Sequence, residues 1–145
     1  MILKETIAIE LVEIEPNNFH LFVQARIGRR NARLLLDTGA SKTAFDLNSI
    51  LLFVKEKSLR NHEIQSVGLG SNQVLTQLSH LPVWKFGEIK LHKKEVAVLD
   101  LSHVNQAYQI MGFPAIDGVM GSDILMELNA VINYPKLTLT LKQKV

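Results

Sequence analysis

One carboxylate in this chain stands where a run of leucines meets a glycine-containing turn. The sequence reads LLLDTGAS over residues 34–41, with the acid at Asp37. Leucines draw a strand toward the interior, where a lone charge is costly, so Asp37 is awkward as a purely structural residue. The glycine after it permits a sharp turn, and such a loop can present one carboxylate at the base of a cleft for acid–base chemistry. The alternative interpretation is a turn that Asp37 merely caps.

Two later segments also carry glycines at positions that suggest a purpose. Residues 116–121 read IDGVMG, which predicts an apolar strand interrupted by glycine, and residues 122–129 have the composition of a short helix. Residues 64–78 predict a hairpin whose tip holds Gly68, Leu69 and Gly70, because two glycines near an asparagine favour a flexible turn. Three chemically distinctive segments therefore follow one another along the chain.

In this order the segments resemble the retropepsin-like aspartic proteases. That family has a hydrophobic-Asp-Thr/Ser-Gly-Ala loop, a flap hairpin with glycines, a hydrophobic-hydrophobic-Gly strand, a short helix and a final strand. The corresponding residues here are Leu36 to Ala40, Gly68 to Gly70, Val119-Met120-Gly121, the helix from Ser122, and Asn133 to Leu141. The resemblance covers roughly residues 7–142. It implies a mostly β, single-domain acid protease fold with its active site at a homodimer interface.

Aspartic proteolysis needs two carboxylates that share a proton, because like charges about 3 Å apart cannot both ionise. This chain has a single Asp-Thr-Gly, and Asp117-Gly118 is no second copy because it lacks the intervening hydroxyl residue. We therefore expect a two-fold homodimer in which Asp37 meets its own symmetry mate. For Asp117 we expect hydrogen bonds to nearby backbone instead of catalysis.

The resemblance also implies a role for each matching residue. Asp37 is the catalytic carboxylate, and the loop is supported by Thr38, Gly39 and Ala40. The Thr38 hydroxyl would bond across the dimer, and the Gly39 amide would face the carboxylate. The remaining site residues would contact substrate, form the flap tip or pack beside the loop; they are Ser41, Gly68, Leu69, Gly70, Val119, Met120 and Gly121. The substrate would be an extended peptide or protein, cleaved without a metal or another cofactor.

The elements expected to position these residues are mainly strands. Alternating apolar residues predict strands near residues 7–14, 20–27, 33–36, 81–86, 95–99 and 137–141. Helical spacing predicts short helices at 46–54, with Asp46 as N-cap, at 104–111 and at 122–129. Trp84 and Phe86 should share one buried strand face. The fold class is mostly β with two or three short helices, in one domain over residues 1–145.

The composition excludes several other functions. The 145 residues include no cysteine, so disulfides and thiolate chemistry are ruled out. A formal net charge of +2 gives no strong footprint for nucleic acid. No apolar stretch approaches the roughly 20 residues of a membrane-spanning helix, so we expect no membrane partner and a cytoplasmic location. The five histidines show no short metal-site spacing.

Two functions from different classes remain open at this stage. The first is a homodimeric aspartic endopeptidase that uses paired Asp37 carboxylates. The second is a non-catalytic peptide-binding or dimerisation module on the same fold. The terminal segments, the strand at 137–141 above all, are expected to contribute to the dimer, because strand edges near a two-fold axis tend to pair.

Overall fold

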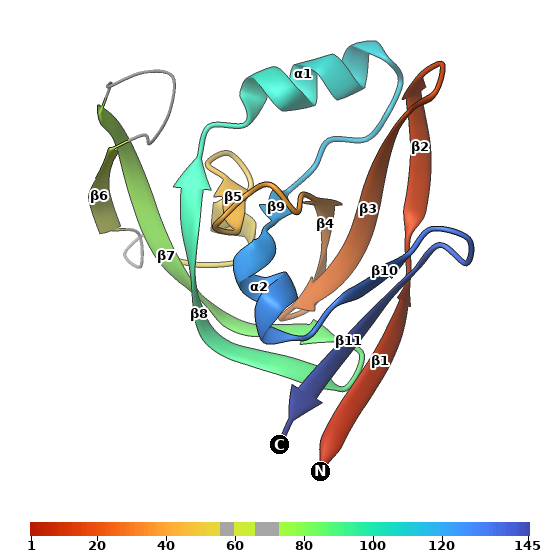
Figure 1. Ribbon diagram of the computed structural model, residues 1–145. Helices are drawn as coiled ribbons and strands as arrows, with labels where there is room; N and C mark the ends of the chain where they lie inside the picture. Colours follow the sequence, from red (N-terminus) through yellow and green to blue (C-terminus); the bar gives the residue numbers. More distant parts are fainter. Residues whose placement is uncertain (56–59, 66–72) are drawn as a thin grey trace.

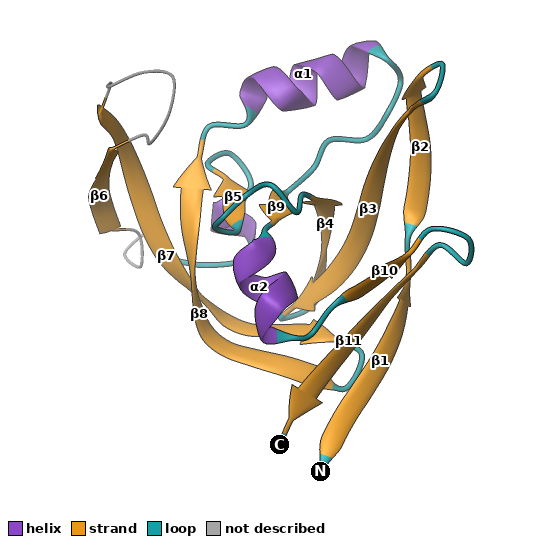
Figure 2. Cartoon of the chain, viewed as in Figure 1, coloured by secondary structure: helices purple, strands orange, loops and turns teal. Residues whose placement is uncertain are grey.

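The computed structural model describes residues 1–55, 60–65 and 73–145, and strands dominate it (Figures 1 and 2). A three-stranded sheet has the order β1-β11-β10, and an eight-stranded sheet has the order β2-β3-β4-β9-β5-β8-β7-β6, with a further pairing between β3 and β7. The strands are β1 Ile2–Ala8, β2 Glu10–Glu15, β3 Asn18–Ile27, β4 Arg30–Leu36, β5 Ala44–Asp46, β6 Arg60–Gln65, β7 Gln73–Phe86, β8 Ile89–Leu99, β9 Gly118–Met120, β10 Val131–Asn133 and β11 Thr138–Lys144. The α-helices among the described residues are α1 Ser102–Ile110 and α2 Ser122–Glu127. The predicted fold class, mostly β with few short helices, is confirmed.

The two ends of the chain lie side by side (Figure 1). Strands β1 and β11 pair antiparallel from Ile2↔Lys144 to Ala8↔Thr138. The alternation predicted for 137–141 is present, with Leu139 and Leu141 fully buried. β10 joins the other side of β11, so β1 and β10 are the two edges of this small sheet.

The two glycine-bearing motifs meet at the centre of the large sheet. β4 and β9 pair in parallel, with Leu35 opposite Val119 and Leu36 opposite Met120. β5 packs on the far side of β9 so closely that a Cβ added at Gly118 would lie 2.5 Å from the Ala44 carbonyl oxygen. Only glycine fits at this position, and its absence of a side chain lets three strands converge beneath the Asp37 loop.

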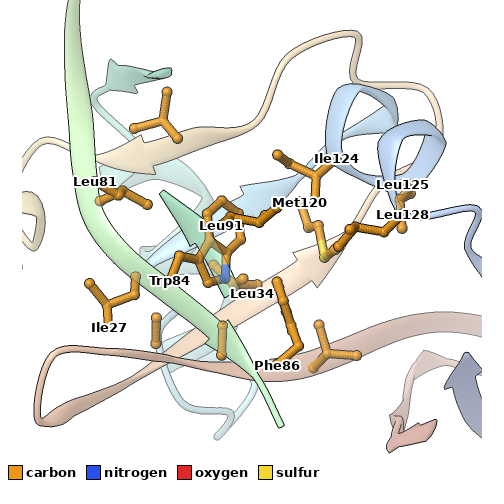
Figure 3. Packing of buried hydrophobic residues seen from close by; sticks show 14 of the residues in the cluster. Ile27, Leu34, Leu81, Trp84, Phe86, Leu91, Met120, Ile124, Leu125 and Leu128 are labelled. Atoms are coloured by element: carbon orange, nitrogen blue, oxygen red, sulfur yellow. The ribbon is translucent and has the colours of Figure 1, made fainter. Parts of the chain in front are cut away.

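One main hydrophobic core lies between the large sheet, α2 and β11 (Figure 3). Trp84 and Phe86 are both buried in it and their rings are 5.3 Å apart, as their spacing along β7 predicts. Met120 and Ile124 link the core to the β9–α2 segment. The floor beneath the Asp37 loop is therefore tightly packed.

The helix predicted at 46–54 is wrong. Residues up to Asp46 form β5, and only a single 3-10 turn follows at Ile50–Leu52. Asp46 is 4% exposed, and its Oδ1 accepts a 3.0 Å hydrogen bond from the Leu101 amide instead of capping a helix. Parallel pairing of Phe45 with Val98 on β8 keeps the chain extended through Asp46, so tertiary pairing overrides helical spacing at the point where the helix was expected to begin.

The other predicted elements shift in extent. The strand predictions at 81–86 and 95–99 are parts of the longer β7 and β8, and the strand expected over 116–121 shortens to β9. The helices predicted at 104–111 and 122–129 are α1 and α2, and Gly121 is the N-cap of α2. Within the described residues, no helix has the length and apolar character needed to cross a membrane.

Candidate functional site

Asp37 begins a tight turn directly after β4. Its amide donates to the Met120 carbonyl at 3.1 Å, and its own carbonyl accepts from the Ala40 amide at 3.1 Å. The Gly39 amide donates to Oδ1 of Asp37 at 2.9 Å, which is the contact expected for this glycine. The Asp37 side chain is exposed in the single chain, contrary to the expectation that the leucine strand draws it inward. The turn presents this carboxylate at the surface in a defined orientation.

The β9–α2 segment locks onto this loop, with Val119, Met120 and Gly121 all beside it. The Ser122 amide donates to the Ala40 carbonyl at 2.7 Å. A Cβ added at Gly121 would stand 2.7 Å from that same oxygen and 2.9 Å from the Lys42 carbonyl carbon. Glycine is required here because backbone, which cannot move aside as a flexible side chain can, surrounds the position.

Two residues that sequence reasoning missed hold this junction together. Thr43 is fully buried, and its hydroxyl donates to Oδ1 of Asp123 at 2.7 Å while accepting from the Gly121 amide at 3.0 Å. The Thr43 amide also donates to the same Asp123 oxygen at 3.0 Å. The only local signal was an acid in the first turn of the predicted α2. Nothing in the sequence near Thr43 identifies its distant partner.

Asp117 serves the backbone, as its sequence context indicated. Its Oδ2 accepts from the Arg33 amide at 2.8 Å, and its amide donates to the Arg33 carbonyl at 2.8 Å. Its own carbonyl accepts from the Asp46 amide at 2.8 Å. These bonds tie the start of β9 to β4 and β5, and they leave Asp37 as the carboxylate presented by the glycine turn.

Asp37 and Thr38 border a cavity of about 300 Å³. Its other walls come from β3, the end of β4, and β10 with the residue after it; these residues are Phe19, His20, Leu21, Leu35, Leu36, Ile132 and Tyr134. A larger cavity of about 440 Å³ lies between the 3-10 turn and β7, but Asp37 does not line it. The smaller cavity is therefore the one that belongs to the candidate site.

The remaining predicted site residues are placed as follows. Ser41 and Thr38 are exposed, and among the described residues no side chain or backbone group hydrogen-bonds the Thr38 hydroxyl. Gly68, Leu69 and Gly70 lie outside the described residues, although the strands leading to them pair as far as Gln65↔Gln73. Across the parts of the chain that the structure describes, no three histidine or acidic side chains gather as metal ligands would.

No protein-family model and no curated protein matches the sequence, but solved structures resemble the fold. A retropepsin-like aspartic protease from Rickettsia conorii superposes with a TM-score of 0.56 at 16% identity, covering 98% of this chain and 92% of that one. The retroviral protease-like domain of Ddi1 from Leishmania major gives 0.51 at 15% identity, covering 84% and 87% of the two chains. The EIAV protease, solved with the inhibitor HBY-793, gives 0.50 at 21% identity, covering 84% and 99%. The chain thus has the retropepsin-like fold.

Proposed function

We propose that this protein is a homodimeric aspartic endopeptidase that hydrolyses extended polypeptides. The observation that carries the proposal is the Asp37-Thr38-Gly39 turn, which presents an exposed carboxylate held by the Gly39 amide at 2.9 Å within a retropepsin-like fold. A turn that Asp37 merely caps would also make the Gly39 contact, so the cavity beside the carboxylate is what favours a catalytic role. Fold alone does not carry an activity, so the proposal rests on this local geometry.

The chemistry follows from two facing carboxylates. One Asp37, ionised, removes a proton from a water molecule whose oxygen bonds to the scissile carbonyl carbon. The protonated Asp37 of the second copy donates to the carbonyl oxygen and stabilises the charge that develops there. The carbon–nitrogen bond then breaks as the leaving nitrogen takes up a proton from the dyad. No cofactor enters this sequence of steps.

The second carboxylate must come from a second copy of the chain. Asp117 is committed to the backbone of Arg33, and no other acid lines the cavity beside Asp37 among the described residues. A two-fold axis near the turn would set Asp37 against its symmetry mate and give the Thr38 hydroxyl a partner. The exposure of both side chains in the single chain supports this arrangement.

The edge strand β10 is the surface on which we expect the second copy. Val131 and Tyr134 are 55% and 61% exposed, and Phe19, which borders the same cavity as Tyr134, is 47% exposed. These apolar side chains lie at or next to the cavity that holds Asp37, and β10 has a ladder partner on one side only. β1 is the other edge of this sheet, but β10 and not β1 borders the Asp37 cavity, so we expect β10 to supply the contribution of the terminal region to the dimer.

Replacing the proposed catalytic carboxylate separates this function from the binding-module alternative. Asp37→Asn should lower peptide cleavage by about 10²-fold or more, because the amide cannot take the proton from water. The fold, dimerisation and peptide binding should persist, and Glu88→Gln, at an exposed site in the β7–β8 turn, is the control. Cleavage that survives in Asp37→Asn would refute the protease; a wild-type protein that binds peptides without cutting them would favour the binding module.

A further inference from the structure

His20 is a half-buried residue on β3 that borders the same cavity as Asp37. The proposed proteolysis assigns it no role. An imidazole in a cavity of about 300 Å³ is a polar recognition group if its ring is held in one orientation and one nitrogen is available. Both conditions can be checked from the contacts around the ring.

Tyr108 of α1 holds the His20 ring in place. The Tyr108 hydroxyl lies 2.8 Å from Nδ1 of His20, and the two rings meet edge-on with their centres 5.8 Å apart. Tyr108 is only 2% exposed, and its ring also packs edge-on against Phe22. α1 crosses the molecule between the ends of β8 and β2 (Figure 1), and Tyr108 anchors it in a second cluster with Val12, Phe22 and Ile116. The imidazole is therefore fixed by a buried support.

The same contact assigns the proton on the imidazole. Among the described residues, His20 Nδ1 is the one hydrogen-bond partner of the buried Tyr108 hydroxyl. A buried hydroxyl donates its proton, so the neutral His20 accepts at Nδ1 and carries its own proton on Nε2. Burial raises the pKa of Tyr108, which keeps the phenol protonated and able to donate. In both the neutral and the protonated ring, Nε2–H is then a donor, and His20 borders the cavity.

We propose that His20 is a specificity-determining residue, whose Nε2–H donates to a carbonyl-bearing side chain of the bound peptide next to the cleaved bond. The chemical class is a carboxamide or carboxylate, of which glutamine is the uncharged representative. Tyr108 is its positioning residue. The inference rests on the proposed function, and it requires that a peptide, and not the second copy docked on β10, fills the Asp37 cavity.

The test measures binding, so it does not depend on catalysis. The peptides contain a reduced bond that cannot be cleaved. They are compared in pairs, and the two members of a pair differ only in carrying glutamine or leucine, residues of similar size, at one position next to that bond. Each flanking position is tested in turn. Affinity for the full-length dimer is measured by fluorescence anisotropy, and dimerisation is monitored by sedimentation. Wild type should prefer glutamine at one position by about three- to tenfold, the worth of one hydrogen bond.

Three variants separate recognition from a structural role. His20→Phe should abolish the glutamine preference, and His20→Gln, which keeps an N–H donor, should retain part of it. Tyr108→Phe keeps the ring but loses the hydroxyl that orients His20, so the preference should shrink while the fold persists. A merely structural role would lower the affinity of both peptides equally.

The inference is overturned if His20→Phe keeps the wild-type preference, if it changes only the dimer dissociation constant, or if a folded wild-type dimer binds neither peptide. A change in the dimer dissociation constant alone would make His20 a contact between the two copies of the chain. A His20-dependent preference in a protein that cuts no peptide would support the inference and refute the protease, so the two failures are distinguishable.

Discussion

The hydroxyl of Thr43 donates a 2.7 Å hydrogen bond to Oδ1 of Asp123, joining the residue before β5 to the first turn of α2. The same hydroxyl oxygen accepts from the Gly121 amide at 3.0 Å. One buried side chain therefore satisfies two groups of the β9–α2 segment that supports the candidate site. Removing the Thr43 hydroxyl should therefore lower both the stability of the fold and the activity.

We predict that Thr43→Val destabilises the protein by about 2–4 kcal/mol, because the isosteric valine leaves the Asp123 oxygen and the Gly121 amide short of a partner. Chemical denaturation at fixed protein concentration measures the change. Thr140→Val is the matched control, since the Thr140 and Thr6 hydroxyls meet at 3.5 Å in an exposed setting. The control should cost less than about 0.5 kcal/mol. If the two variants lower the free energy of unfolding equally, the buried hydrogen bonds of Thr43 do not stabilise the fold more than the exposed pair does.

Gly121→Ala should destabilise by about 1–3 kcal/mol or more, because the added methyl meets the backbone of Ala40 and Lys42 below 3.0 Å. Gly39→Ala is the comparison in stability, since its methyl would meet only the Asp37 carboxylate, at 3.3 Å. Thermal unfolding of both variants and wild type decides the order. A Gly121→Ala protein as stable as Gly39→Ala would contradict the close approach of β9–α2 to the loop.

We predict that Tyr134→Glu raises the dimer dissociation constant at least about tenfold, because the two-fold axis would bring like charges together at a surface now apolar. The folded chain should survive, since Tyr134 is 61% exposed. Met126→Glu is the control, an exposed apolar residue that does not line the cavity. Sedimentation gives the dissociation constant, and specific activity should fall with dilution in parallel. Undiminished activity of a fully monomeric sample would refute the shared site.

The Glu10–Arg33 pair predicts a pH-dependent contribution to stability. Both terminal nitrogens of Arg33 donate to Glu10 at 3.0 Å, and these hydrogen bonds lower the pKa of the Glu10 carboxyl. Because the pKa is lowered in the folded state, the ionised carboxyl stabilises the fold at pH values above the ordinary glutamate pKa. This stabilisation is lost as the pH falls through the folded-state pKa. The Glu10 side chain is 53% exposed, so water screens the pair and limits its contribution to less than about 1 kcal/mol.

Glu10→Gln should therefore lower the unfolding temperature at pH 7, and its difference from wild type should vanish near pH 3. Glu15→Gln, also exposed and on the same strand, should give the same small difference at both pH values. Thermal denaturation of the three proteins at each pH measures this. A Glu10→Gln deficit that persists unchanged at pH 3 would assign it to packing, not to charge.

Local chemistry let the sequence predict much of the candidate site. The resemblance implied the Asp37–Gly39 contact, which joins residues two positions apart, whereas the need for glycine at 121 comes from the distant backbone of Ala40 and Lys42 and is seen only in the fold. Strand alternation likewise predicted the buried faces that hold Trp84 and Leu139. Contacts between residues close in sequence and the alternating burial of a strand can be predicted from the sequence alone.

Tertiary structure alone decided the rest. Pairing of β5 with β8 keeps the chain extended as far as the buried Asp46, where the expected helix at 46–54 was to begin, and only a single 3-10 turn follows. The partners of Thr43 and His20 lie 80 and 88 residues away, a distance over which no local pattern carries information. Whether a polar side chain caps a turn, braces a loop or lines a cavity depends on which distant element the fold brings to it.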